Sequence, residues 1–140
     1  MQIYFGDVSL CYTYSLAMAL EAYGYNLRPE YLEALMLMGN GASIVKEDEQ
    51  HPLVFFDNGM PDLSISHVLE VLGFDYEEYY LREGQALDLD LIRSKLKALL
   101  VNGPVVLGPL DMGHLSYNPN HTHLYGVDHF VSVYDLDDDY

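Results

Sequence analysis

The chain has 140 residues, half of them hydrophobic, which is enough for one compact domain and excludes an intrinsically disordered protein. Its 6 basic and 22 acidic residues give a net charge of −16, which opposes general affinity for phosphate backbones, so we expect no nucleic-acid partner. No apolar run approaches the roughly 20 residues of a membrane span, and no secretion signal opens the sequence, so we expect a cytoplasmic protein without a membrane partner.

Two helices are predicted in the first third of the chain. Ser9 is a candidate N-cap for a helix of about 14 residues that ends at Gly24 and holds Cys11, the single cysteine, in its first turn. Pro29 suits the first turn of a second helix, which we expect to be ended by Gly39 and Gly41. The cysteine therefore lies at a helix N-terminus.

The middle of the chain alternates irregular and regular segments. Residues 42–60 are predicted as a loop or a small hairpin, because a charged tip separates two short apolar runs. Helical spacing of apolar residues predicts a third helix over 61–73, and alternation predicts a strand over 74–81. Asp88 or Asp90 then caps a fourth helix, whose exposed face carries Arg93, Lys95 and Lys97.

Two clear strands are predicted at 104–110 and 126–136, joined by a long connection. A connection of this length between paired strands is usually functional. The predicted fold class is α+β, with N-terminal helices packed on a small, mostly antiparallel sheet that contains both strands.

Cys11 and His129 are the first candidates for chemistry. A helix N-terminus is one of the environments that stabilise a thiolate, and its free N–H groups can donate to an oxyanion. His129 lies near the start of an otherwise apolar strand. Each residue alone is more often a buried core residue, but a cysteine on an early helix and a histidine on a later strand is the order expected for a nucleophile and its base.

The stretches "CYTYSLAMALEAYG", "NGPVVLGPLDMGHLSY" and "GVDHFVSVYDLDDD" resemble the papain-like cysteine peptidase superfamily. Within it they are most similar to the C39-like peptidases and the N-terminal domain of the butirosin biosynthesis acyltransferase family. The resemblance implies one papain-like domain over residues 1–140, with Cys11 as nucleophile and His129 as base. It further implies acyl transfer through a thioester, no cofactor, and a peptide, an acyl carrier or an amine as substrate.

The sequence departs from that family where the remaining catalytic groups are expected. The family has a glutamine shortly before the cysteine, whereas here Gln2 is the only glutamine upstream of it, and the family's orienting Asp or Asn follows the histidine strand, where this sequence stops at Tyr140. Asp135 is the candidate for the third catalytic residue. Either the triad is incomplete or the chain is a fragment of a longer protein, and the alternative function is a catalytically inactive papain-like domain that serves as a binding or assembly module.

The connection between the two last strands suggests a third function. It concentrates imidazoles and carboxylates, which are metal ligands, in Asp111, His114, His121, His123 and Asp128. A metal-binding loop would use His114, His121 and His123, while the competing interpretation is a solvated polar loop. The sequence leaves the oligomeric state open.

Overall fold

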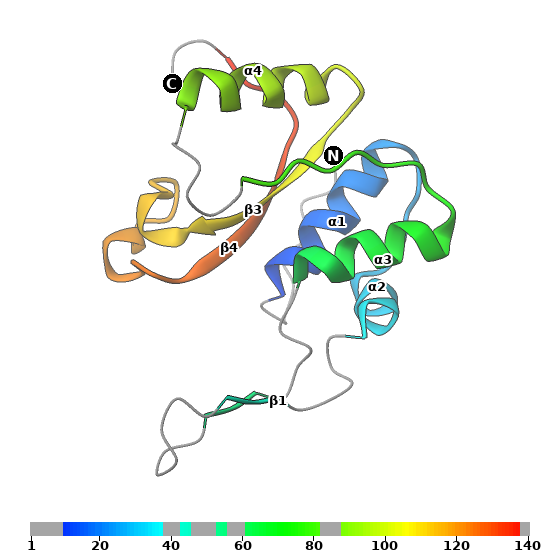
Figure 1. Ribbon diagram of the computed structural model, residues 1–140, viewed down its shortest axis with the longest axis horizontal. Coiled ribbons are helices and arrows are strands. Elements are labelled where there is room, and N and C mark those ends of the chain that lie inside the picture. The colour runs from blue at the N-terminus through cyan, green and yellow to red at the C-terminus, as the bar shows by residue number, and fades with distance from the viewer. Residues whose placement is uncertain (1–9, 38–42, 46–52, 56–60, 82–87, 138–140) are drawn as a thin grey trace. The chain divides into compact units, whose positions relative to one another are not determined.

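The computed structural model describes residues 10–37, 43–45, 53–55, 61–81 and 88–137. Within these ranges the chain has four α-helices and two antiparallel sheets of two strands each, so the predicted α+β class is confirmed (Figure 1). No helix in the described ranges is long and apolar enough to cross a membrane. The chain divides into two compact units, Leu27–Glu77 and the remainder on either side of it. A single domain over 1–140 stays a prediction.

The first unit is built around helix α1, Cys11–Ala22. Its N-cap is Leu10, with φ −102° and ψ 80° and no side-chain capping bond, so the prediction of Ser9 as N-cap was wrong. At the other end, Gly24 has φ 88° and its N–H donates to Glu21 O at 2.9 Å, while Tyr25 N–H donates to Leu20 O at 3.0 Å. These two bonds form a Schellman motif, which confirms Gly24 as the helix stop.

Helix α1 packs against the sheet formed by β3, Val105–Asp111, and β4, Asp128–Val133 (Figure 1). The strands are antiparallel, with Leu107 opposite Val131 and Leu110 opposite His129. The predicted strands 104–110 and 126–136 are thus present, but the second is shorter at both ends. The buried residues of α1 lie on one broad side of the helix: Thr13, Ser15, Leu16, Ala17, Ala19 and Leu20.

Phe130 anchors β4 in this core. Its side chain is 7% exposed, and its ring meets Tyr12 of α1 edge-on, with the ring centroids 6.4 Å apart. Opposite it, the register between Leu107 and Leu110 is irregular, and a Cβ at Gly108 would lie 2.5 Å from Phe130 Cδ1. Glycine at 108 therefore leaves the space that the Phe130 ring occupies.

The connection between β3 and β4 is folded and tied at its base. It contains the short helices η1, Met112–His114, and η2, His121–His123, which contact each other. Asp111 Oδ1 accepts from Gly113 N–H at 2.7 Å and from Gly126 N–H at 3.1 Å. One carboxylate thus joins both ends of the connection.

Helix α4, Leu89–Leu100, precedes β3. Asp88 is its N-cap and accepts from Leu91 N–H at 3.0 Å, so capping by Asp88 is confirmed, and Arg93, Lys95 and Lys97 are exposed as predicted. The strand predicted over 74–81 was wrong, because no strand is assigned to this segment and its Tyr76, Tyr79 and Tyr80 are exposed. Alternating polarity predicts a strand only where a partner strand is available.

The second unit contains α2, Pro29–Met36, and α3, Pro61–Leu72, which pack on each other. Leu37 adopts the left-handed conformation with φ 58° and ends α2, so the expected end at Gly39 was wrong. Leu32 and Val68, both 0% exposed, form the centre of this core.

Strands β1, Ser43–Val45, and β2, Leu53–Phe55, form an antiparallel hairpin with Ile44 opposite Val54, which confirms the hairpin alternative for residues 42–60.

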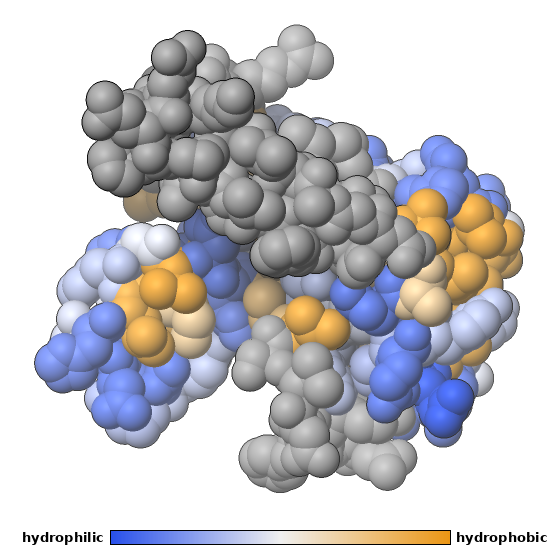
Figure 2. Space-filling view, turned by 90° about the horizontal axis from the view of Figure 1, so that it is seen from below, coloured by the Kyte–Doolittle hydropathy of each residue, from blue (hydrophilic) through white to orange (hydrophobic). Residues whose placement is uncertain are grey.

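Several large apolar side chains of the described residues remain exposed. On the face drawn in Figure 2, apolar residues gather in separate patches bordered by polar ones.

Candidate active site

Cys11 is the first residue of α1, so its position follows from where the helix begins. The first backbone hydrogen bond of this helix runs from Tyr14 N–H to Leu10 O at 3.1 Å, and the N–H of Cys11 precedes it at the positive end of the helix dipole. Cys11 Sγ, half-buried, accepts a hydrogen bond from Phe130 N–H at 3.4 Å. The sulfur therefore lies against β4 at the residue that follows His129.

His129 is the second residue of β4 and is half-buried. Burial lowers its pKa below the ordinary value of 6.5, because a charged imidazolium loses solvation there. The ring is thus neutral at pH 7 and able to accept a proton.

Cys11 and His129 line one cavity of about 360 Å³, which we name the Cys11 cavity. Its wall on α1 consists of residues at helical spacing, and its wall on β4 includes residues that alternate along the strand. The full lining is Cys11, Tyr14, Ser15, Met18, Tyr117, His129, Val131 and Ser132. One face of α1 and one face of β4 thus bring the two predicted residues together, within the first unit.

Tyr117 joins this cavity from a third segment, the connection between β3 and β4. It lies in a turn closed by Asn118 N–H, which donates to Leu115 O at 3.0 Å. The residue as a whole is 68% exposed, but the pKa of Tyr117 is raised above the ordinary 10.0. The larger cause is partial burial, and the smaller is the negative charge of Cys11. Sequence reasoning missed this residue, because nothing in the pattern separates it from the other tyrosines, 13 in all.

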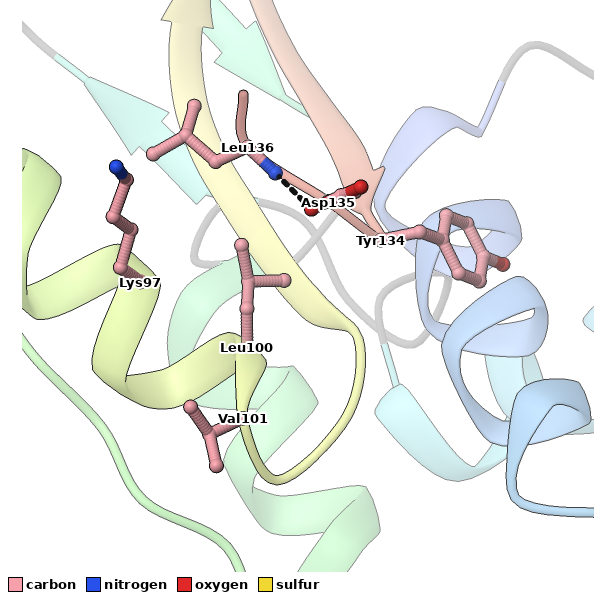
Figure 3. Close-up of a pocket in the computed structure, with 6 residues that line it drawn as sticks. All are labelled: Lys97, Leu100, Val101, Tyr134, Asp135 and Leu136. Atoms are coloured by element: carbon pink, nitrogen blue, oxygen red, sulfur yellow. Dashed lines mark hydrogen bonds between the residues drawn. The ribbon is translucent and has the colours of Figure 1, made fainter. Parts of the chain in front are cut away.

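Asp135 lies elsewhere. It lines a second cavity of about 200 Å³, which we name the Asp135 cavity, with Lys97, Leu100, Val101, Tyr134 and Leu136 (Figure 3). Its Oδ1 accepts from Leu136 N–H at 2.8 Å. Among the described residues no carboxylate lines the Cys11 cavity, so the structure does not bring Asp135 to Cys11 and His129.

The three loop histidines do not share a common site. The His114 ring meets Tyr125 edge-on at 5.3 Å, and His121 Nδ1 lies 2.9 Å from Asn118 O, while His123 is exposed in the same short helix as His121. In the part of the chain that the structure describes, no three His, Cys, Asp or Glu side chains are placed to hold a metal ion. The predicted ligand set of His114, His121 and His123 is therefore not assembled there.

Comparison with known proteins finds one informative likeness. The chain is 41% identical over 139 residues to the uncharacterized protein YobF of Bacillus subtilis (strain 168). The matched region covers 99% of this chain and 43% of the relative. The chain thus spans less than half the length of that relative. No family model matches the chain, and no solved structure matches it. The site must be interpreted from its own residues.

Proposed function

We propose that this chain is a cysteine-nucleophile acyl-transfer enzyme, a peptidase or an amine acyltransferase, with Cys11 as nucleophile and His129 as general base. One observation carries the proposal: Cys11 and His129, far apart in sequence, line the same cavity. The hydrogen bond from Phe130 N–H to Cys11 Sγ fixes the sulfur beside the histidine's own strand. A positioned thiol with an adjacent base is the arrangement that cysteine acyl transfer requires.

The chemistry follows from these two groups. His129 takes the proton of the Cys11 thiol, Sγ forms a bond to the carbonyl carbon of the acyl group, and the carbonyl electron pair moves to oxygen. The N–H of Cys11 donates to that oxyanion. When the intermediate collapses, the bond to the leaving group breaks, His129 returns the proton to it, and a thioester remains. Water or an amine then attacks the thioester, with His129 as base again.

The papain-like fold is part of the same proposal. A helix that begins at Cys11 and packs on an antiparallel sheet that carries His129 agrees with the sequence resemblance. Peptides, acyl carriers and amines are the proposed substrate classes. The charge of −16 favours an amine-bearing acceptor through long-range attraction. A cytoplasmic location stays a prediction.

An activated acyl donor tests the proposal without knowledge of the natural substrate. Because Cys11 is the single cysteine, every thioester reports on it. After incubation of the protein with p-nitrophenyl acetate, peptide mass spectrometry should find the acetyl group on Cys11, with release of nitrophenolate. Cys11→Ser should reduce this release to the rate of spontaneous hydrolysis. Equal release from both proteins, with no acetyl group on Cys11, would contradict the proposal.

The second candidate function is a catalytically inactive papain-like domain that acts as a binding or assembly module. It is favoured by the absence of a carboxylate from the described lining of the Cys11 cavity, since an orienting carboxylate normally supports the histidine. Alkylation by iodoacetamide at pH 7 separates the two functions. If His129 activates the thiol, His129→Ala slows alkylation, whereas the control His123→Ala does not. Equal rates for all three proteins would favour the binding module.

A further inference from the structure

We propose that Tyr117 is a catalytic oxyanion donor, whose phenolic hydroxyl hydrogen-bonds to the carbonyl oxygen of the acyl group while Cys11 attacks. This inference rests on the proposed acyl-transfer function and names a residue that the sequence did not single out. Tyr117 belongs to the β3–β4 connection, so the site would combine three separate segments of the chain.

The geometry of the attack places the donor near the sulfur. In the tetrahedral intermediate the oxyanion is bonded to the carbon that Cys11 Sγ has attacked, so its donors must lie around Sγ. Tyr117 lines the same cavity as Cys11 and His129. The charge of Cys11 acts on the ionisation of Tyr117, so the phenol and the sulfur lie within electrostatic range of each other.

The protonation state of Tyr117 suits a donor. Partial burial and the negative charge of Cys11 both raise its pKa above 10.0, so the phenol keeps its proton at neutral pH. When Sγ attacks, the negative charge of the thiolate passes to the carbonyl oxygen, so the cavity still holds one negative charge beside Tyr117, which continues to favour the protonated, donating form. His129 has the opposite property, because burial keeps it neutral and able to accept.

The backbone around Tyr117 holds it in place. Tyr117 lies within the turn in which Asn118 N–H donates to Leu115 O. A second turn follows directly, in which His121 N–H donates to Asn118 O at 3.0 Å. Asp111 ties Gly113 and Gly126 at the base of the connection. A donor that is positioned before the reaction contributes most, because it does not have to be reorganised when the charge develops.

A comparison of two reactions at the same sulfur tests the donor role. Acylation by p-nitrophenyl acetate passes through an oxyanion, whereas alkylation by iodoacetamide displaces iodide at a saturated carbon and forms none. Tyr117→Phe should slow acylation by about 10² to 10³, the effect of removing one oxyanion donor, and leave alkylation within about twofold. Tyr125→Phe is the matched control, because it removes a hydroxyl from the same connection outside the cavity lining, and it should change neither rate.

Each outcome decides between the inference and the proposed function. If Tyr117→Phe slows acylation and alkylation equally, the residue has only a structural role and the inference is overturned. If Tyr117→Phe leaves the acylation rate unchanged, while the wild type is still acylated faster than His129→Ala, the inference fails and the acyl-transfer function stands. If wild-type Cys11 is acylated no faster than glutathione at the same pH, the proposed function fails and the donor role with it.

Discussion

Two cavities border the same strand, and they differ in what they can do. The Cys11 cavity at the start of β4 combines a thiol, a neutral imidazole and a phenol from three segments of the chain. The Asp135 cavity, beyond the end of β4, combines Lys97 of α4 with Asp135 and apolar neighbours, and among the described residues neither a thiol nor an imidazole lines it (Figure 3). The chemical groups in each cavity therefore depend on which element contributes to its lining.

The path of the chain after β4 explains why Asp135 is separated from His129. Residues 129 and 135 are six positions apart, which is about 20 Å along extended chain at roughly 3.3 Å per residue. The hydroxyl of Tyr134 donates to Met18 O of α1 at 2.9 Å, and the next residue, Asp135, lines the cavity beside α4. His129 within β4 and Asp135 beyond its end thus line different cavities.

The largest expected effect on stability concerns the packing between β3 and β4. Gly108→Ala brings a Cβ within 2.5 Å of Phe130 Cδ1, so the buried ring or the bulge must shift, which should lower the free energy of unfolding by about 1–3 kcal/mol. Urea denaturation measures this loss. Gly126→Ala is the control, because the added Cβ meets no atom of the described residues within 4 Å and strains only the backbone, where φ is 79°. A loss below about 0.5 kcal/mol for Gly108→Ala would show that Phe130 does not fix this site.

The pH dependence of acylation tests the base in the Cys11 cavity. Because burial lowers the pKa of His129, the ring becomes half-protonated only at a pH below 6.5. The ratio of the wild-type rate to the His129→Ala rate should therefore have its titration midpoint below pH 6.5 and fall about tenfold per pH unit on the acid side of that midpoint. A midpoint at or above pH 6.5 would contradict a His129 whose pKa is lowered by burial.

Loss of the α4 cap should lower the stability of the protein without affecting the Cys11 cavity. Asp88→Ala removes the acceptor for Leu91 N–H and should lower the free energy of unfolding by about 1 kcal/mol. Asp90→Ala is the control, because Asp90 lies in the same first turn but is not the N-cap, and it should lower the free energy of unfolding less. Acylation of Cys11 should stay within about twofold for both variants. A large fall in acylation would show that the two cavities are coupled through α4 and β3.

The smallest effect is expected at Asp135 itself. Asp135→Asn should change acylation of Cys11 less than about twofold, because the carboxylate faces another cavity, whereas loss of an orienting carboxylate in a catalytic triad lowers the rate by roughly 10⁴. Steady-state release of nitrophenolate measures the difference. A fall of tenfold or more would place Asp135 in the catalytic machinery after all.

Local chemistry made much of the fold predictable from the sequence. Gly24 stops α1 and Asp88 caps α4 because each acts on its own helix end, and such signals do not depend on the rest of the chain. The same reasoning failed over 74–81, since a strand needs a partner that local alternation does not reveal. The N-cap of α1 is Leu10 and not the predicted Ser9, and it makes no side-chain capping bond. The place of α1 depends on its packing against β4, which local signals do not reveal.

The candidate site was predictable only in part. Cys11 and His129 were found because their residue types are rare and their order is informative. Tyr117 was not found, since its place in the cavity depends on how the β3–β4 connection folds back from Asp111. Asp135 was chosen because it is near His129 in sequence. In the structure it lies beyond the end of β4 and lines the cavity beside α4.

The dependence of Cys11 acylation on His129 tests the central claim most directly. The second-order rate constant for p-nitrophenyl acetate should be measured at pH 7 for the wild type and for His129→Ala, with circular dichroism to confirm that both are folded. General-base assistance predicts a ratio of about 10² to 10⁴. A ratio near 1 between two folded proteins would contradict the account, because Cys11 would then react without the histidine that shares its cavity.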